Sequence, residues 1–191
     1  MKTPDYHRAG RPVFVRRFAC WLFKRMGWTL EGSVPCDRKL ILVVGPHTSN
    51  WDFVICVLAM LSLDIRLHFL AKHSLFKKPL GTVMTALGGI PINRSKPEGF
   101  VDETAGLIRK KDELILAITP EGTRSKVSKL KTGFSRIARE VPCPLMPILL
   151  DFGKKEVLLM DARDSSPSPE QDALIYREIF TGAKGKNPYN F

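Results

Sequence analysis

The most apolar part of the chain is a short charge-free run of branched residues followed by a longer apolar run. Residues 40–44 contain no charged side chain, which predicts a strand buried on both faces of a sheet. Residues 53–63 are all apolar or uncharged, long enough for about three turns of a buried helix. Gly45 and Pro46 end the strand. Residues 47–52 therefore form a turn at its carboxyl end, where open α/β sheets usually bind their ligands.

Strand-like and helix-like patterns alternate along the rest of the chain. The predicted strands are residues 40–44, 65–71, 90–92, 114–118, 145–150 and 156–160, and the predicted helices are 53–63, 75–87, 97–110, 132–140 and 169–180. This alternation predicts a single α/β domain over residues 31–183, with a largely parallel sheet flanked by helices. Pro91 favours an edge or irregular position for strand 90–92. Residues 184–191 are expected to form a loose tail.

Residues 13–30 have the pattern of an amphipathic helix, and with the polar residues 1–12, expected to be a mobile arm, they form the segment 1–30. One side of the helical wheel is apolar and holds Val15, Phe18, Ala19, Leu22, Phe23 and Met26. The other side is basic and holds Arg16, Arg17, Lys24 and Arg25. Trp21 and Trp28 lie nearer the margins. Two interpretations stay open: the helix lies in the headgroup layer of an anionic membrane, or it packs on the domain with its charged side in water.

The overall charge narrows the choice of partner. The 191 residues carry a formal net charge of +11, with 44% hydrophobic and 26% charged residues, as in an ordinary folded protein. The excess positive charge favours an anionic partner, whether nucleic acid, an acidic membrane surface or a phosphorylated substrate. We do not expect nucleic acid, because the sequence contains no helix-turn-helix, RRM or finger pattern.

The cysteines and histidines give no metal signal. The four cysteines form no C-x-x-C pair and the four histidines show no ligand spacing, so neither a metal site nor a disulfide framework is predicted. This favours a reducing compartment. The longest apolar run, residues 53–63, is about half of the ~20 residues that span a bilayer. The charged N-terminus does not resemble a signal peptide.

The turn after the first strand carries a candidate acid–base pair. Residues five apart on one helix are rotated by about 140°, so His47 must lie outside the helix if Asp52 is to reach its ring. In that case Asp52 fixes the tautomer and leaves the other ring nitrogen as a base. A second interpretation is that Ser49 and Asp52 simply cap the helix. The two interpretations are compatible.

Two later strands also lead into charged turns. Strand 90–92 is followed by Asn93 and Arg94, and strand 114–118 by the segment 119–125 with Arg124. Two arginines at one sheet edge could bind a phosphate in bidentate fashion. The alternative is a surface turn with a solvated ion pair.

Four motifs of this chain, taken in order, resemble those of a known protein family. The motifs are His47-x-x-x-x-Asp52, Gly89-Ile90-Pro91-Ile92-Asn93-Arg94, Pro120-Glu121-Gly122-Thr123-Arg124-Ser125 and Val141-Pro142-Cys143-Pro144-Leu145-Met146-Pro147. Together they resemble the four blocks of the glycerolipid acyltransferase family, which includes the 1-acylglycerol-3-phosphate acyltransferases. Thr119 stands where the family usually has phenylalanine.

The resemblance implies an acyltransferase for groups other than aminoacyl groups. It would move a fatty acyl group from acyl-CoA or acyl-carrier protein to a hydroxyl of a lysophospholipid or glycerol-phosphate-type acceptor, with no further cofactor. By the same resemblance His47 is the general base and Asp52 orients it. The residues implied to bind the phosphorylated acceptor are Arg94, Glu121, Gly122, Thr123 and Arg124. The implied location is cytoplasmic, peripheral on the inner face of the cell membrane, against an anionic surface.

Two other hypotheses stay open. One is a non-catalytic protein that binds anionic lipid and retains the fold, and His47 with Asp52 argues against it because a pure binder needs no base. The other is a hydrolase that uses water as the acceptor. A covalent acyl-serine route is unsupported, since the chain has no G-x-S-x-G elbow.

Overall fold

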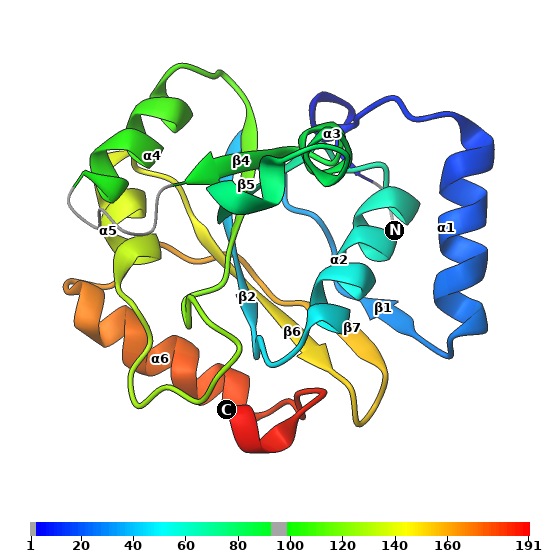
Figure 1. Ribbon diagram of the computed structural model, residues 1–191. Helices are drawn as coiled ribbons and strands as arrows, with labels where there is room; N and C mark the ends of the chain where they lie inside the picture. Colours follow the sequence, from blue (N-terminus) through cyan, green and yellow to red (C-terminus); the bar gives the residue numbers. More distant parts are fainter. Residues whose placement is uncertain (1–2, 93–98) are drawn as a thin grey trace.

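The computed structural model describes residues 3–92 and 99–191 (Figure 1). In that part of the chain seven strands form one sheet in the order β1-β7-β6-β2-β5-β3-β4. The strands are β1 (Thr29–Glu31), β2 (Lys39–Gly45), β3 (Leu67–Lys72), β4 (Gly89–Ile92), β5 (Leu114–Ile118), β6 (Leu145–Asp151) and β7 (Glu156–Leu159).

The sheet is largely parallel, as predicted. Among the described strands only the β6–β7 pair is antiparallel. β2 lies between β5 and β6, and helices pack on both of its faces, which explains why its sequence is apolar on both faces. β4 lies at one edge of the sheet, which confirms the position that Pro91 favours.

Helices cover both faces of the sheet (Figure 1). The helices are α1 (Val13–Arg25), α2 (Asn50–Ser62), α3 (Leu80–Ala86), α4 (Phe100–Arg109), α5 (Gly133–Glu140) and α6 (Pro169–Thr181), with 3-10 turns at Asp5–His7, His73–Phe76 and Pro188–Asn190. α1 and α2 pack on one face against Leu40 and Val44 of β2. α4, α5 and α6 pack on the other against Ile41 and Val43. The alternation along β2 thus separates two apolar clusters.

Two predicted helices are shorter than the pattern indicated. The predicted helix 75–87 is divided, because Lys77 before the Lys78-Pro79 pair is extended, and α3 begins only after Pro79. The predicted helix 13–30 ends at Arg25, because Gly27 adopts a φ of +81°. The next residues, Thr29–Glu31, form β1 and pair with β7.

The expectation of a mobile N-terminal arm is wrong for residues 3–11. His7 is buried, and its ring Nε2 lies 2.6 Å from the carbonyl oxygen of Asp37. Asp64, which is fully buried, accepts hydrogen bonds from Arg8 Nε at 3.3 Å and from the backbone amide of Arg11 at 2.9 Å. Polar contacts with a buried carboxylate hold this arm in place. Such contacts do not require a regular spacing of apolar residues, so the sequence pattern does not reveal them.

The expectation of a loose C-terminal tail is wrong as well. The backbone amide of Asn187 donates to Thr48 Oγ1 at 3.2 Å, and its side-chain amide donates to the Thr48 carbonyl at 3.0 Å. The Phe191 ring lies 6.4 Å from that of Phe180 on α6. The tail therefore lies against the turn that carries the candidate base.

Candidate active site

The β2–α2 turn places His47 outside the helix, as the spacing predicted. Gly45 ends β2, and a side chain does not fit there because an added Cβ would lie 2.5 Å from the Phe180 ring. Ser49 is extended and forms the N-cap of α2, and its hydroxyl accepts the Trp51 amide at 2.9 Å. The turn is thus fixed at both ends.

His47 and Asp52 meet in this turn. His47 Nδ1 lies 3.0 Å from Asp52 Oδ2, and the same oxygen accepts the backbone amides of Thr48 at 2.7 Å and Ser49 at 2.8 Å. Asp52 is therefore both the acidic member of a capping box and the partner of the imidazole. A ring that donates from Nδ1 has a lone pair on Nε2, the arrangement that a general base requires.

The Asp52 carboxylate is almost entirely removed from water. Its residue is 1% exposed, and its second oxygen, Oδ1, has no hydrogen-bond partner within the described chain. A buried anionic oxygen without a partner costs stability. A buried polar atom without a partner is more common at functional sites than elsewhere in a folded protein.

Glu121 contacts the same turn from the loop after β5. Its Oε1 accepts the backbone amide of His47 at 2.9 Å, and the residue is only 2% exposed. The loop is tight at Gly122, whose φ of +65° favours glycine, and Lys131 donates its backbone amide to Pro120 at 2.8 Å. Sequence patterns give no sign of this contact, because it joins residues 74 positions apart through a backbone amide.

Burial raises the pKa of the Glu121 carboxyl above its ordinary value of 4.5, and the hydrogen bond from His47 offsets part of that shift. The folded state thus favours the protonated acid. The stability that this preference contributes is complete below the unfolded pKa and is lost as the pH rises through the folded pKa.

Glu121→Gln should therefore change how stability depends on pH. Glutamine does not titrate and keeps an acceptor oxygen for His47. Relative to the variant, the unfolding free energy of the wild type should fall as the pH rises above about 4.5. Urea denaturation of both proteins at a series of pH values measures this difference. Parallel curves over that range would show that Glu121 has an unshifted pKa.

The remaining predicted site residues are Thr123, Arg124 and Arg94. Thr123 and Arg124 are exposed in the loop that follows Glu121. β5 pairs with β2, so this loop and the His47 turn leave the sheet from neighbouring strands at the same edge. Arg94 lies outside the described residues. Within the described chain no group of three or more histidine, cysteine or acidic side chains is placed to hold a metal ion.

Comparison with known proteins assigns the class. The model of the Acyltransferase family matches residues 21–151, so the chain belongs to that family. The resemblance inferred from the four motifs is thereby confirmed at the level of the family.

The chain is also similar to individual curated proteins. The chain is 25% identical over 130 residues to a 1-acyl-sn-glycerol-3-phosphate acyltransferase of Streptococcus pneumoniae, covering 63% of this chain and 48% of that protein. It is 31% identical over 129 residues to an enzyme of the same name from Cocos nucifera, covering 64% of this chain and 40% of the relative. The chain thus spans about half the length, or less, of these curated relatives.

A solved structure has the same fold. The crystal structure of the 1-acyl-sn-glycerophosphate (LPA) acyltransferase PlsC from Thermotoga maritima matches with a TM-score of 0.59 and 21% identity. The match covers 88% of this chain and 76% of that one. It confirms the predicted fold class.

Proposed function

We propose that this protein transfers a fatty acyl group from a thioester donor to a hydroxyl of a lysophospholipid or glycerol-phosphate-type acceptor. The observation that carries the proposal is the His47–Asp52 pair, 3.0 Å apart at the carboxyl edge of the sheet. Membership of the Acyltransferase family supports it, as do the names of the relatives.

The pair can perform the proton transfers of this reaction. His47 Nε2 takes the proton from the acceptor hydroxyl while the hydroxyl oxygen attacks the thioester carbon. The new O–C bond forms, the C–S bond breaks, and the departing thiolate takes the proton from the imidazolium. A positioned base contributes about 10²–10⁴-fold to such a step. Asp52 stabilises the imidazolium, and Glu121 positions the His47 backbone.

The exposed cations after β5 are suited to a phosphorylated acceptor. Arg124, Lys126, Lys129 and Lys131 are exposed in one loop next to the His47 turn. Guanidinium and ammonium groups bind phosphate through charge-assisted hydrogen bonds. In this proposal Arg124 and Arg94 contact the acceptor phosphate.

The test of this function uses a panel of acceptors with acyl-CoA or acyl-carrier protein as the donor. We expect transfer to lysophospholipids or glycerol 3-phosphate, and Arg124→Ala should raise the acceptor KM about tenfold with little change in kcat. Arg136→Ala, an exposed arginine on α5, is the control. Release of free fatty acid that no acceptor suppresses would instead indicate a hydrolase.

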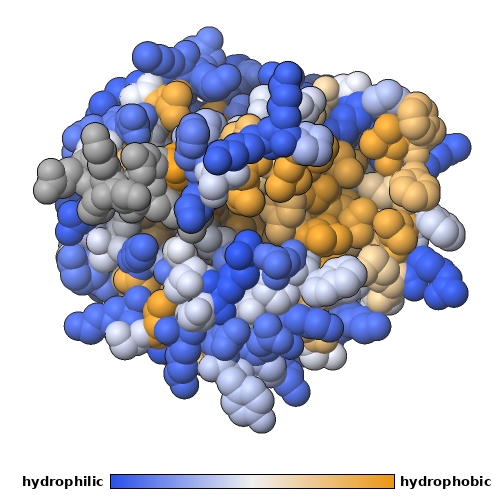
Figure 2. Space-filling view, in the orientation of Figure 1, coloured by the Kyte–Doolittle hydropathy of each residue, from blue (hydrophilic) through white to orange (hydrophobic). Residues whose placement is uncertain are grey.

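The surface supports attachment to a membrane. Figure 2 shows an apolar surface right of centre, where Figure 1 draws α1, α2 and α3. Its exposed large residues include Val13, Phe14, Phe18, Trp21, Val54, Leu75, Leu80 and Val83. Exposed basic residues in or next to the same helices are Arg17, Lys24, Arg25, Lys77 and Lys78. None of the described helices is long and apolar enough to cross a membrane. In our proposal this face docks on an anionic leaflet, such as the inner face of the cell membrane.

Phe14→Ser with Phe18→Ser should weaken binding to anionic vesicles at least about tenfold, since each phenylalanine loses about 1.5–3 kcal/mol of apolar burial. Vesicle sedimentation measures this. The matched control is Leu107→Ser with Leu174→Ser, two exposed leucines on α4 and α6 across the sheet. An equal loss of vesicle binding in both double variants would exclude α1 as the docking surface. A protein that binds vesicles but transfers to no acceptor would be the non-catalytic lipid binder.

A further inference from the structure

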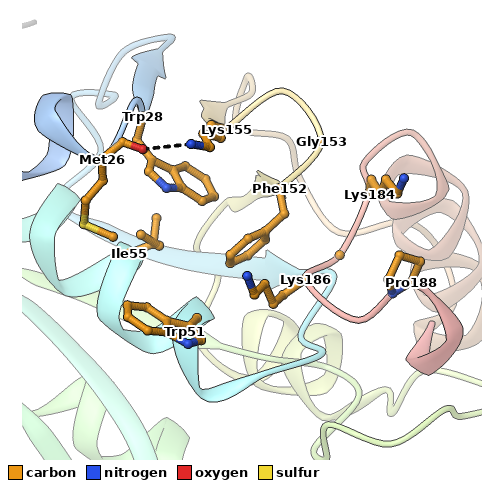
Figure 3. A pocket seen from close by; sticks show the side chains of 11 residues that line it. Met26, Trp28, Trp51, Ile55, Phe152, Gly153, Lys155, Lys184, Lys186 and Pro188 are labelled. Carbon is orange, nitrogen blue, oxygen red and sulfur yellow. Dashed lines mark hydrogen bonds between the residues drawn. The ribbon is translucent and has the colours of Figure 1, made fainter.

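A pocket of about 390 Å³ lies beside the candidate active site (Figure 3). Its walls come from the start of α2, the segment after α1, the turn between β6 and β7, and the C-terminal tail. The volume is within the range of about 300–1,000 Å³ that is typical of small-molecule sites. The lysines that line it lie beyond residue 151, where the match to the family model ends.

The pocket is cationic. Lys155, Lys184 and Lys186 line it, and no acidic residue does. None of the three forms an ion pair with a carboxylate within the described chain: Lys155 Nζ donates to the Met26 carbonyl at 3.2 Å, and Lys186 Nζ lies 5.8 Å from the centre of the Phe152 ring. The nearby Asp151 Oδ1 already accepts backbone amides from the turn, Gly153 at 2.8 Å and Lys154 at 3.1 Å, and from the tail, Lys184 at 3.4 Å.

Flat rings line the pocket together with the lysines. Trp28 is buried and packs edge-on against Phe152, with ring centres 4.8 Å apart. Trp51 is 51% exposed and lines the same pocket as Lys186 (Figure 3). An exposed indole in the same pocket as ammonium groups that have no carboxylate partner is suited to a ligand that joins an aromatic ring to phosphate groups.

The pocket adjoins the turn that carries the base. A Cβ on Gly185, in the pocket wall, would lie 2.7 Å from Thr48 Cγ2, and Trp51 directly precedes Asp52. In the sheet order β2 lies between β6 and β5. The lysine pocket follows β6 and the Arg124 loop follows β5, so the two cationic regions flank His47.

We propose that this pocket binds the nucleotide end of an acyl-CoA donor. The adenine ring stacks on Trp51, and the phosphate groups contact Lys184, Lys186 and Lys155. The inference rests on the proposed acyl transfer and deepens it, because it assigns the donor to coenzyme A. A carrier protein presents its thioester arm on a single phosphate without a nucleotide, so it would leave the aromatic wall empty.

Binding is tested without activity, using adenosine 3′,5′-diphosphate as the probe and tryptophan fluorescence as the signal. We expect saturable binding that Lys184→Ala with Lys186→Ala weakens at least tenfold. The matched control is Lys110→Ala with Lys111→Ala, which removes two exposed charges before β5, at the opposite end of the sheet. Any one of four results would overturn the proposal. These are no binding, equal weakening in both double variants, equally tight binding of pyrophosphate, and displacement of the probe by anionic vesicles.

Steady-state kinetics distinguish donor binding in the pocket from the chemical step. With acyl-CoA, the Lys184/Lys186 double variant should show a KM raised about tenfold and an unchanged kcat. With the matching acyl-pantetheine, which lacks the nucleotide, its KM should equal that of the wild type. Transfer from acyl-carrier protein without probe binding would overturn this inference and leave the proposed function standing. Probe binding through the lysines without transfer from any donor would support the assigned pocket but overturn the proposed acyl transfer.

Discussion

His47→Ala should lower the rate of acyl transfer by about 10²–10⁴-fold while the fold and vesicle binding stay unchanged. Alanine removes the only group that the proposal assigns to accept the hydroxyl proton. The turn itself should persist, because Thr48 and Ser49 still donate to Asp52 and the backbone amide at position 47 still donates to Glu121. Single-turnover transfer, thermal unfolding and vesicle sedimentation measure the three properties.

The control for this experiment is His73→Ala, an exposed histidine in the 3-10 turn after β3. It should transfer at the wild-type rate. A His47→Ala protein that is folded and fully active would remove the imidazole from the mechanism.

Asp52→Asn and Asp52→Ala should separate the two roles of this carboxylate. Asparagine keeps an oxygen for the amides of Thr48 and Ser49 but carries no charge to stabilise an imidazolium. We expect transfer to fall about 10²–10⁴-fold with a small change in stability. Alanine leaves two buried amides unpaired, so the unfolding free energy should also fall by about 1–3 kcal/mol. Transfer rates and urea denaturation give the two values.

A different result would separate the two interpretations of the turn. If Asp52→Asn transfers as fast as the wild type while Asp52→Ala is destabilised, Asp52 is a helix cap and nothing more. The structure shows that one oxygen serves both partners, so only the pair of variants can tell these roles apart.

The parts of the fold that follow from local patterns could be predicted from the sequence. The uncharged run 40–44 indicates a strand buried on both faces, which is the core of β2, and Pro91 favours the edge or irregular position that β4 occupies. The angle between residues five apart on a helix showed that His47 had to lie outside α2. Each of these inferences uses residues that are close in the chain.

The features that sequence reasoning missed depend on contacts between distant residues. Glu121 supports the His47 backbone across 74 positions, and Asn187 contacts Thr48 across 139. Both contacts use backbone groups, which are the same in every residue and leave no pattern. The lysine pocket also forms only when the tail folds back beside α2.

The proposed mechanism requires that Asp52 hold His47 with its proton on Nδ1 and leave Nε2 free to act as a base. Nitrogen-15 NMR of the His47 ring is the decisive measurement, because it reports which ring nitrogen carries the proton. We expect a protonated, hydrogen-bonded Nδ1 and an unprotonated Nε2 in the wild type, and loss of that preference in Asp52→Ala. A wild-type ring with its proton on Nε2 would show that His47 is not held as a base by Asp52.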